Sequence, residues 1–157
     1  MNIKQPANFD YNGVFEFKWS PDFVSTLDKR FNKAQEYIDS SCIRLMVPYT
    51  PMRTGMLTES VKLGTVIGSG ELRYLSPYAR YLYYGEIYGP NIPIFEGGEL
   101  TGFFSPLGQK KHPTGREMHY DTSVHPQAGK LWFERMKADH AEEIREGAER
   151  IARGLAA

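Results

Sequence analysis

The stretch from residue 20 to residue 48 reads SPDFVSTLDKRFNKAQEYIDSSCIRLMVP and decides how the chain folds. Its apolar side chains recur every three or four residues, a period that places them on one face of an α-helix. They are Phe23, Leu27, Phe31, Ala34, Ile38, Cys42 and Leu45. Ser20, Pro21 and Asp22 predict the helix start, as the N-cap, a proline at the first helical position and an acid in the first turn. Pro48 lacks the N–H that a continuing helix needs, so the helix ends before it.

A second helix with the same period is predicted from Gly129 onward. Its apolar face comprises Trp132 or Phe133, Met136, His140, Ile144, Ala148, Ile151 and Leu155. On this face His140 is interpreted as a packed or interfacial histidine. Pairs of glutamate and arginine one turn apart, Glu146 with Arg150 and Glu149 with Arg153, support the helix. Glycine inside a helix lowers its stability by about 1 kcal/mol relative to alanine. We therefore expect the helix to be thin at the contact that it makes through Gly147.

Two segments alternate with the period of a β-strand. In residues 14–19 three aromatic residues alternate with charged ones, which predicts a strand with one buried face. A second alternation runs up to the glycines of residues 68–70 and predicts a hairpin around them. Its apolar or threonine positions are Val61, Leu63, Thr65 and Ile67. Residues 78–84 fit either a short helix or a strand.

These patterns predict one α+β domain over residues 1–157, in which a twisted, mostly antiparallel sheet packs against both long helices. The helix residues expected to share a core with that sheet are Phe23, Leu27, Phe31 and Ile38, and Phe133, Met136, Ile144 and Ile151. Residues 86–127 are rich in glycine and proline and predict a long inserted loop. Because ordering such a segment is entropically costly, we expect other chains to hold it.

The composition limits the functional classes. Nineteen Lys and Arg balance nineteen Asp and Glu, so the chain lacks the basic excess of a nucleic-acid-binding protein. No apolar run reaches the about 20 residues of a membrane helix. The N-terminal residues lack the pattern of a secretory signal, so we expect the protein to act where it is made. The single cysteine, Cys42, fits a reducing cytosol.

Sequence signatures of catalysis are missing. The chain has no Gly-x-Ser-x-Gly, no Gly-x-x-x-x-Gly-Lys and no His-Glu-x-x-His. Cys42 falls on the apolar face of the first helix, where a thiol behaves as a small hydrophobic group rather than a nucleophile. His112, His119 and His125 share one stretch with Asp121, but their spacing matches no zinc-binding pattern. Solvated loop histidines are the favoured interpretation, and we expect no enzymatic activity, no cofactor and no bound metal.

Aromatic residues exceed what a core of this size needs, with ten Tyr and nine Phe. A cluster of candidate subunit-interface residues comprises Tyr78, Tyr81, Tyr83 and Tyr84. Together with the nearby Arg73 and Arg80 these rings fit base stacking. Because aromatic residues outnumber cations, a sheet face or a subunit contact is favoured over nucleic acid. A second cluster, Lys110, Lys111 and Arg116, is expected to face a lumen or a partner.

Three segments occur in a fixed order. Residues 47–60 read VPYTPMRTGMLTES, with proline, a short gap, Thr-Gly, Leu and Ser directly after the long helix. Residues 74–85 read YLSPYARYLYYG, with Pro-Tyr-Ala-x-Tyr and a closing glycine, and residues 126–137 read PQAGKLWFERMK at the start of the last helix. This ordered pattern across residues 21–157 resembles the minor capsid and head-to-tail joining (neck, tail-completion) proteins of tailed bacteriophages.

The resemblance implies a virion subunit that forms a ring of six copies in the neck and is assembled in the host cytoplasm. Its partners would be portal-side connector or stopper proteins and tail tube or tail terminator proteins, with genomic DNA passing through the lumen. A neutral subunit fits this role because it avoids multiple phosphate contacts. The family contributes no catalytic residues. The alternatives are a tail terminator or another minor capsid protein and, less favoured, a metal-dependent enzyme or a nucleic-acid-binding module.

Overall fold

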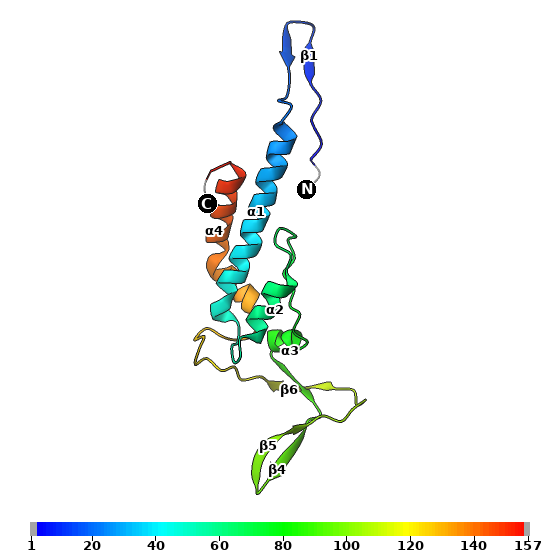
Figure 1. The fold of residues 1–157 in the computed structure, drawn as a ribbon, viewed down its shortest axis with the longest axis vertical. Helices are drawn as coiled ribbons and strands as arrows, with labels where there is room; N and C mark the ends of the chain where they lie inside the picture. The colour runs from blue at the N-terminus through cyan, green and yellow to red at the C-terminus, as the bar shows by residue number, and fades with distance from the viewer. Residues whose placement is uncertain (1–2, 156–157) are drawn as a thin grey trace.

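The computed structural model describes residues 3–155 and shows an elongated α+β fold (Figure 1). Two long helices, α1 (Phe23–Met46) and α4 (Trp132–Ala152), lie side by side and form the body of the molecule. The short helices α2 (Met56–Gly64) and α3 (Ala79–Tyr84) lie near the C-terminal end of α1. One β-hairpin projects from each end of the body. Within the described residues, no helix has both the length and the apolar character needed to cross a membrane.

Helix α1 occupies the predicted stretch and ends before Pro48 as predicted, but its start differs. The predicted N-cap at Ser20 is wrong, because Asp22 holds that position and Ser20 uses its carbonyl to accept the N–H of Phe23 at 3.0 Å. Ser20 and Pro21 therefore precede the helix rather than begin it. At the other end α1 runs directly into the 3₁₀ turn η1 (Val47–Tyr49), where Pro48 is tolerated because a first-turn N–H needs no partner.

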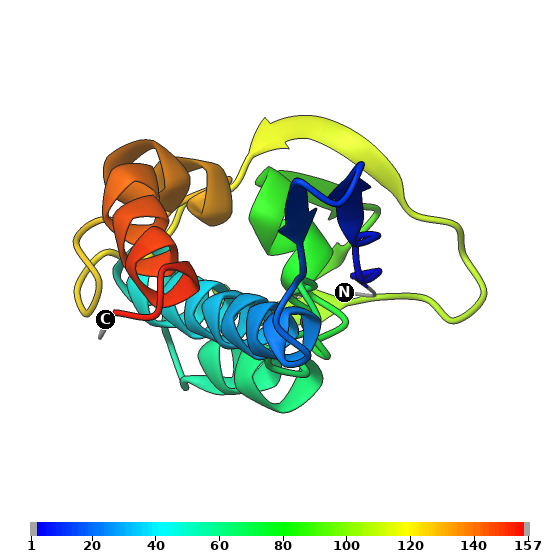
Figure 2. The same cartoon turned by 90° about the horizontal axis from the view of Figure 1, so that it is seen from above.

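The two long helices pack directly against each other along the seam that Figure 1 shows. Met136 of α4 is completely buried in this region. The helices approach closely at Gly147, where an added Cβ would collide with the hydroxyl and ring of Tyr37. The predicted thin point of α4 is therefore confirmed, and the side chain that packs against it is Tyr37 of α1. Viewed along the long axis (Figure 2), α4 lies on one side of α1 and α2 on the other.

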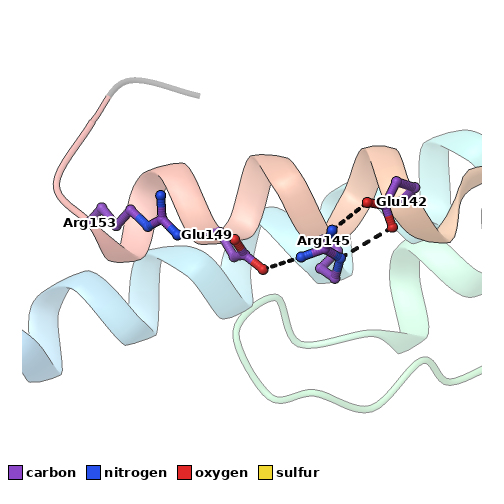
Figure 3. Close-up of polar contacts among 4 residues, drawn as sticks. All are labelled: Glu142, Arg145, Glu149 and Arg153. Carbon is purple, nitrogen blue, oxygen red and sulfur yellow. Dashed lines mark hydrogen bonds and ion pairs between the residues drawn. The ribbon is translucent and has the colours of Figure 1, made fainter.

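A row of charged residues covers part of α4 (Figure 3). Arg145 pairs with Glu142 and with Glu149, and Arg153 lies 3.5 Å from Glu149, as predicted. The predicted pair of Glu146 and Arg150 is not among the ion pairs of residues 3–155. These pairs are exposed, so each adds little to stability.

The predicted sheet against the helices is wrong. The described residues contain three separate two-stranded antiparallel sheets instead, formed by β1 (Phe9–Tyr11) with β2 (Phe15–Phe17), β3 (Glu86–Gly89) with β6 (His112–Glu117), and β4 (Ile92–Glu96) with β5 (Glu99–Phe104). Each is too small to cover a helix face. As a result Phe31, assigned to the core from its period, remains 41% exposed.

The hairpin predicted around residues 68–70 is also wrong. Leu57 and Val61, one helical turn apart, are both buried, and their packing selects helix α2 over a strand. The glycine loop is held by a carboxylate instead of a strand partner. Buried Asp39 of α1 accepts the N–H groups of Gly68 at 2.8 Å and Gly70 at 3.1 Å. Backbone donors that would need a strand partner are satisfied by this side chain.

Residues 86–127 are not the long loop that the sequence predicts. They contain strands β3 to β6, with the β4–β5 hairpin inserted between the two paired outer strands. Its turn is formed by Gly97 and Gly98, both with positive φ, which is the conformation that a two-residue hairpin loop requires. The sequence of residues 78–84 fits either a short helix or a strand. In the structure Ala79–Tyr84 form helix α3. Gly85 ends α3 with φ +71 and packs beneath the hydroxyl of Tyr120.

Candidate interaction surfaces

The three segments that carry the family resemblance meet around Trp132. Its indole N–H donates to the Tyr74 hydroxyl at 2.9 Å, and its ring lies edge-on to Tyr83 with centroids 4.8 Å apart. The backbone joins the same segments: Leu131 N–H donates to the Tyr83 carbonyl at 2.8 Å. Gly129 N–H donates to the Tyr49 carbonyl at 3.2 Å. The pattern therefore lies in the core of the fold.

Tyr49 contributes a second hydrogen-bonded hydroxyl to this core. Its hydroxyl donates to the Asp139 carboxylate at 2.6 Å, a bond that raises the pKa of Tyr49 because ionisation would place two negative charges together. The guanidinium of Arg135 lies 5.6 Å above the ring centroid. His140 packs edge-on against the same ring and pairs with Glu143 at 3.1 Å. His140 is therefore a packed histidine, as predicted.

The other histidines do not converge. His125 is half-buried, and its Nδ1 lies 2.8 Å from the Thr50 carbonyl, which can only accept, so Nδ1 carries the proton. His112 instead stands exposed on β6. Among residues 3–155 no three His, Cys, Asp or Glu side chains lie close enough together to hold a metal ion. Cys42 is buried, and burial together with Asp39 raises the pKa of its thiol.

The four candidate interface tyrosines have different environments. Tyr83 packs into the core on Trp132, and burial raises its pKa. Tyr78, Tyr81 and Tyr84 are exposed, with Tyr78 at 69%. Tyr81 lies edge-on to Tyr88 of β3, with centroids 4.9 Å apart. Three of the four are thus free to contact another molecule, and Tyr83 serves the fold.

The basic cluster lies in the β-rich end of the molecule. Lys110, Lys111 and Arg116 are all exposed. Lys111 donates to the Asn91 side chain at 2.9 Å and so ties the segment before β6 to the connection between β3 and β4. Arg116 lies within β6 itself.

The β1–β2 hairpin, which we call the arm, was missed as a surface by the sequence reasoning. Phe9 pairs with Phe17 and Tyr11 with Phe15, so directly opposite residues place four aromatic rings on one face. All four are at least 41% exposed. Residues 14–19 do contain the predicted strand, but the predicted buried face is wrong. The signal for the hairpin was Asn12-Gly13, both with positive φ in the turn.

The β4–β5 hairpin is apolar on both faces. Consecutive pairs stand on opposite faces of a ladder. These pairs are Ile92 with Phe104, Pro93 with Phe103, Ile94 with Gly102, and Phe95 with Leu100. Its five strand residues in β4 and nearly all of those in β5 are exposed. The missed signal here was Gly97-Gly98 between two apolar runs.

Two hollows lie along the body. A groove of about 490 Å³ runs between α1 and α4 and is almost entirely apolar. A wider hollow of about 710 Å³ lies between α1, α3, residues 70–77 and the start of α4. Ile38, Cys42 and Phe133 line both, so the two hollows are adjacent.

No protein-family model, curated protein or solved structure matches the chain at a level that indicates a relationship.

Proposed function

We propose that this protein is a structural subunit of the neck of a tailed bacteriophage, which forms a ring that joins the DNA-filled head to the tail and catalyses no reaction. The observation that carries the proposal is the uncovered apolar surface of both hairpins. Single chains rarely expose contiguous apolar patches unless another molecule covers them. Aromatic residues are also the ones that protein interfaces enrich.

The placement of the hairpins supports an assembly role. They extend from opposite ends of an elongated body (Figure 1), so one copy can contact neighbours at both ends. In a neck these neighbours are further copies of the chain, portal-side connector proteins and tail proteins. The zero net charge supports the same role, since a ring of neutral subunits does not hold DNA through many phosphate contacts.

The phage assignment, as distinct from a general assembly role, rests on the ordered resemblance of residues 47–60, 74–85 and 126–137. All three segments contribute to the core around Trp132. The residues that carry the resemblance are therefore ones that build the core of this chain.

Electron microscopy of particles made without this gene tests the proposal. We expect DNA-filled heads beside unattached tails of normal length, and normal virions after the intact gene is supplied on a plasmid. Tails of irregular length would instead support the tail-terminator role. Intact, infectious virions in the absence of the gene would overturn a structural role in the particle.

A further inference from the structure

The arm is amphipathic. Phe9, Tyr11, Phe15 and Phe17 occupy one face, whereas Asp10 and Glu16 stand opposite each other on the other. A hairpin of this kind is built to be covered on one side and solvated on the other.

The arm is also weak on its own. Each strand has three residues, and an isolated two-stranded hairpin is at best marginally stable in water. The like charges of Asp10 and Glu16 face each other across the ladder, which is destabilising, although Lys18 pairs with Glu16 at 2.7 Å. The aromatic face therefore needs a cover that also stabilises the hairpin.

A fitting cover exists on the same protein, in the groove between α1 and α4. Phe31, Phe133 and Ile144 form its bulky walls, and small residues such as Ala34 and Ala148 leave room between them. At the rim Arg145 and Glu149 already neutralise each other (Figure 3). An apolar occupant leaves this pair intact. Lys137, the other charged residue of the lining, is exposed and can keep its ammonium group in water.

The arm of a given copy is directed away from its own groove. It extends past the N-terminal end of α1 (Figure 1), and the stack of Phe17 on Trp19 and Trp19 on Phe23, with centroids 4.9 and 4.6 Å apart, holds it there. Pro21 fixes one backbone dihedral in the short connection. The groove that the arm meets therefore belongs to another copy.

Area and charge both favour a second copy as the occupant. Four aromatic side chains about half exposed offer roughly 400 Å², whereas a stable interface buries about 800 Å² on each partner. The arm supplies about half of this area, and the helices on either side of the groove can supply the rest. Nineteen positive and nineteen negative residues give no long-range repulsion between copies.

We propose that the arm docks, aromatic face down, into the α1–α4 groove of a neighbouring copy. Arm and groove are different surfaces, so the contact is heterologous and can repeat from copy to copy until a ring closes. This inference rests on the proposed function, because it specifies how the subunits of the ring hold one another.

Disulfide cross-linking between two singly substituted full-length chains tests the docking. Both chains carry Cys42→Ala, so that the native thiol does not react. The first chain carries Val14→Cys at the arm turn, which keeps all four aromatic residues. The second carries Lys137→Cys, Ala141→Cys or Ala148→Cys, three positions along the groove. Its matched control carries Val66→Cys, an exposed position that does not line the groove.

After the two chains are mixed and oxidised, we expect a covalent dimer containing one copy of each. At least one groove position should cross-link on the order of a thousandfold faster than Val66→Cys, because docking raises the effective thiol concentration from micromolar to millimolar. A second measurement follows self-association of two variants. Ala148→Trp fills the groove, and Phe15→Ser removes one ring from the aromatic face of the arm. Each should weaken self-association on the order of tenfold, and the double variant should weaken it little further because both remove the same contact.

The possible failures are distinguishable. A chain that self-associates but cross-links no faster at the groove than at Val66→Cys overturns the docking and leaves the proposed function standing. So does a disulfide that forms within a single chain carrying both Val14→Cys and Ala148→Cys, in the absence of cross-linking between chains. A chain that stays monomeric at all concentrations and in the particle overturns the docking and the ring together.

Discussion

Aromatic residues are buried in the core of the body and exposed in the two hairpins. In the body Trp132 is 1% exposed, with ring partners on two sides and a hydrogen bond for its indole nitrogen. In the β4–β5 hairpin Phe103 is 63% exposed. The core around Trp132 covers its aromatic residues within one chain, whereas the hairpins form regular structure whose apolar surface is left uncovered.

This difference separates two kinds of information in the sequence. Turn residues and local periodicity specify which segments form hairpins and helices. They do not specify which molecule covers an apolar face, because one alternating pattern serves a core strand and an interface strand equally well. Variants that change stability without association, or association without stability, therefore test this difference between the core and the hairpins directly.

The largest effect on stability is expected from Trp132→Ala, which removes the residue shared by all three core segments. We expect the free energy of unfolding to fall by about 3–5 kcal/mol, the range for truncating a large buried aromatic residue. Urea unfolding followed by circular dichroism measures it. Trp19→Ala is the matched control, since Trp19 packs between Phe17 and Phe23 outside the core. Its cost should stay below about 1.5 kcal/mol, and equal costs would contradict the distinction between body and arm.

How much of this core was predictable differs from element to element. The two long helices are predicted by an apolar periodicity that extends over about six turns. The packed histidine and the thin point of α4 are each predicted from a single residue, His140 and Gly147. The short helix α2 was predicted as a strand because Val61, Leu63 and Thr65 alternate locally. The choice of a helix depends on the burial of Leu57 beside Val61, a tertiary contact that no short window contains.

The candidate surfaces were predictable to a smaller extent. Three of the four candidate tyrosines are exposed, but Tyr83 packs on Trp132, a residue 49 positions away that only the fold brings near. Both hairpins carried a readable signal, Asn12-Gly13 and Gly97-Gly98, flanked by apolar residues. The high glycine and proline content of residues 86–127 obscured the second signal and favoured a loop.

The next effect concerns the loop of residues 68–70. Asp39→Ala leaves the N–H groups of Gly68 and Gly70 without their acceptor, and an unsatisfied partly buried donor costs about 1–3 kcal/mol. Hydrogen exchange at these two amides should accelerate, and the free energy of unfolding should fall within that range. Glu146→Ala, at an exposed carboxylate on α4, serves as the control. Unchanged exchange at both glycines would show that the loop is held by other contacts.

Alkaline pH should also weaken the body. Burial raises the pKa of Tyr74, Tyr83 and Tyr120, and the bond to Asp139 raises that of Tyr49. The unfolded chain therefore loses these protons first, near pH 10, and the folded chain binds more protons above it. Stability is retained below pH 10 and falls as the pH rises further. Urea midpoints from pH 8 to 11 measure the decline, which should be smaller in Tyr49→Phe.

The smallest effect on stability, and the sharpest test of the comparison, is expected from Phe103→Ser in the β4–β5 hairpin. Phe103 is exposed in a single copy, and surface substitutions change the free energy of unfolding by less than about 0.5 kcal/mol. The measurement is made on dilute protein, where dissociated copies dominate, because association adds to apparent stability.

Association of the same variant should respond strongly. If another molecule covers Phe103, the serine loses apolar contact there, and sedimentation at high concentration should show weaker assembly than in the unsubstituted chain. Met56→Ser is the matched control, an apolar residue on α2 outside both hairpins that is even more exposed, and it should change neither quantity. A loss of stability by Phe103→Ser comparable to that of Trp132→Ala would mean that the hairpin is covered by its own chain. Because the hairpin residues stand exposed on both faces of the ladder, we expect the opposite result: an unchanged monomer that assembles less well.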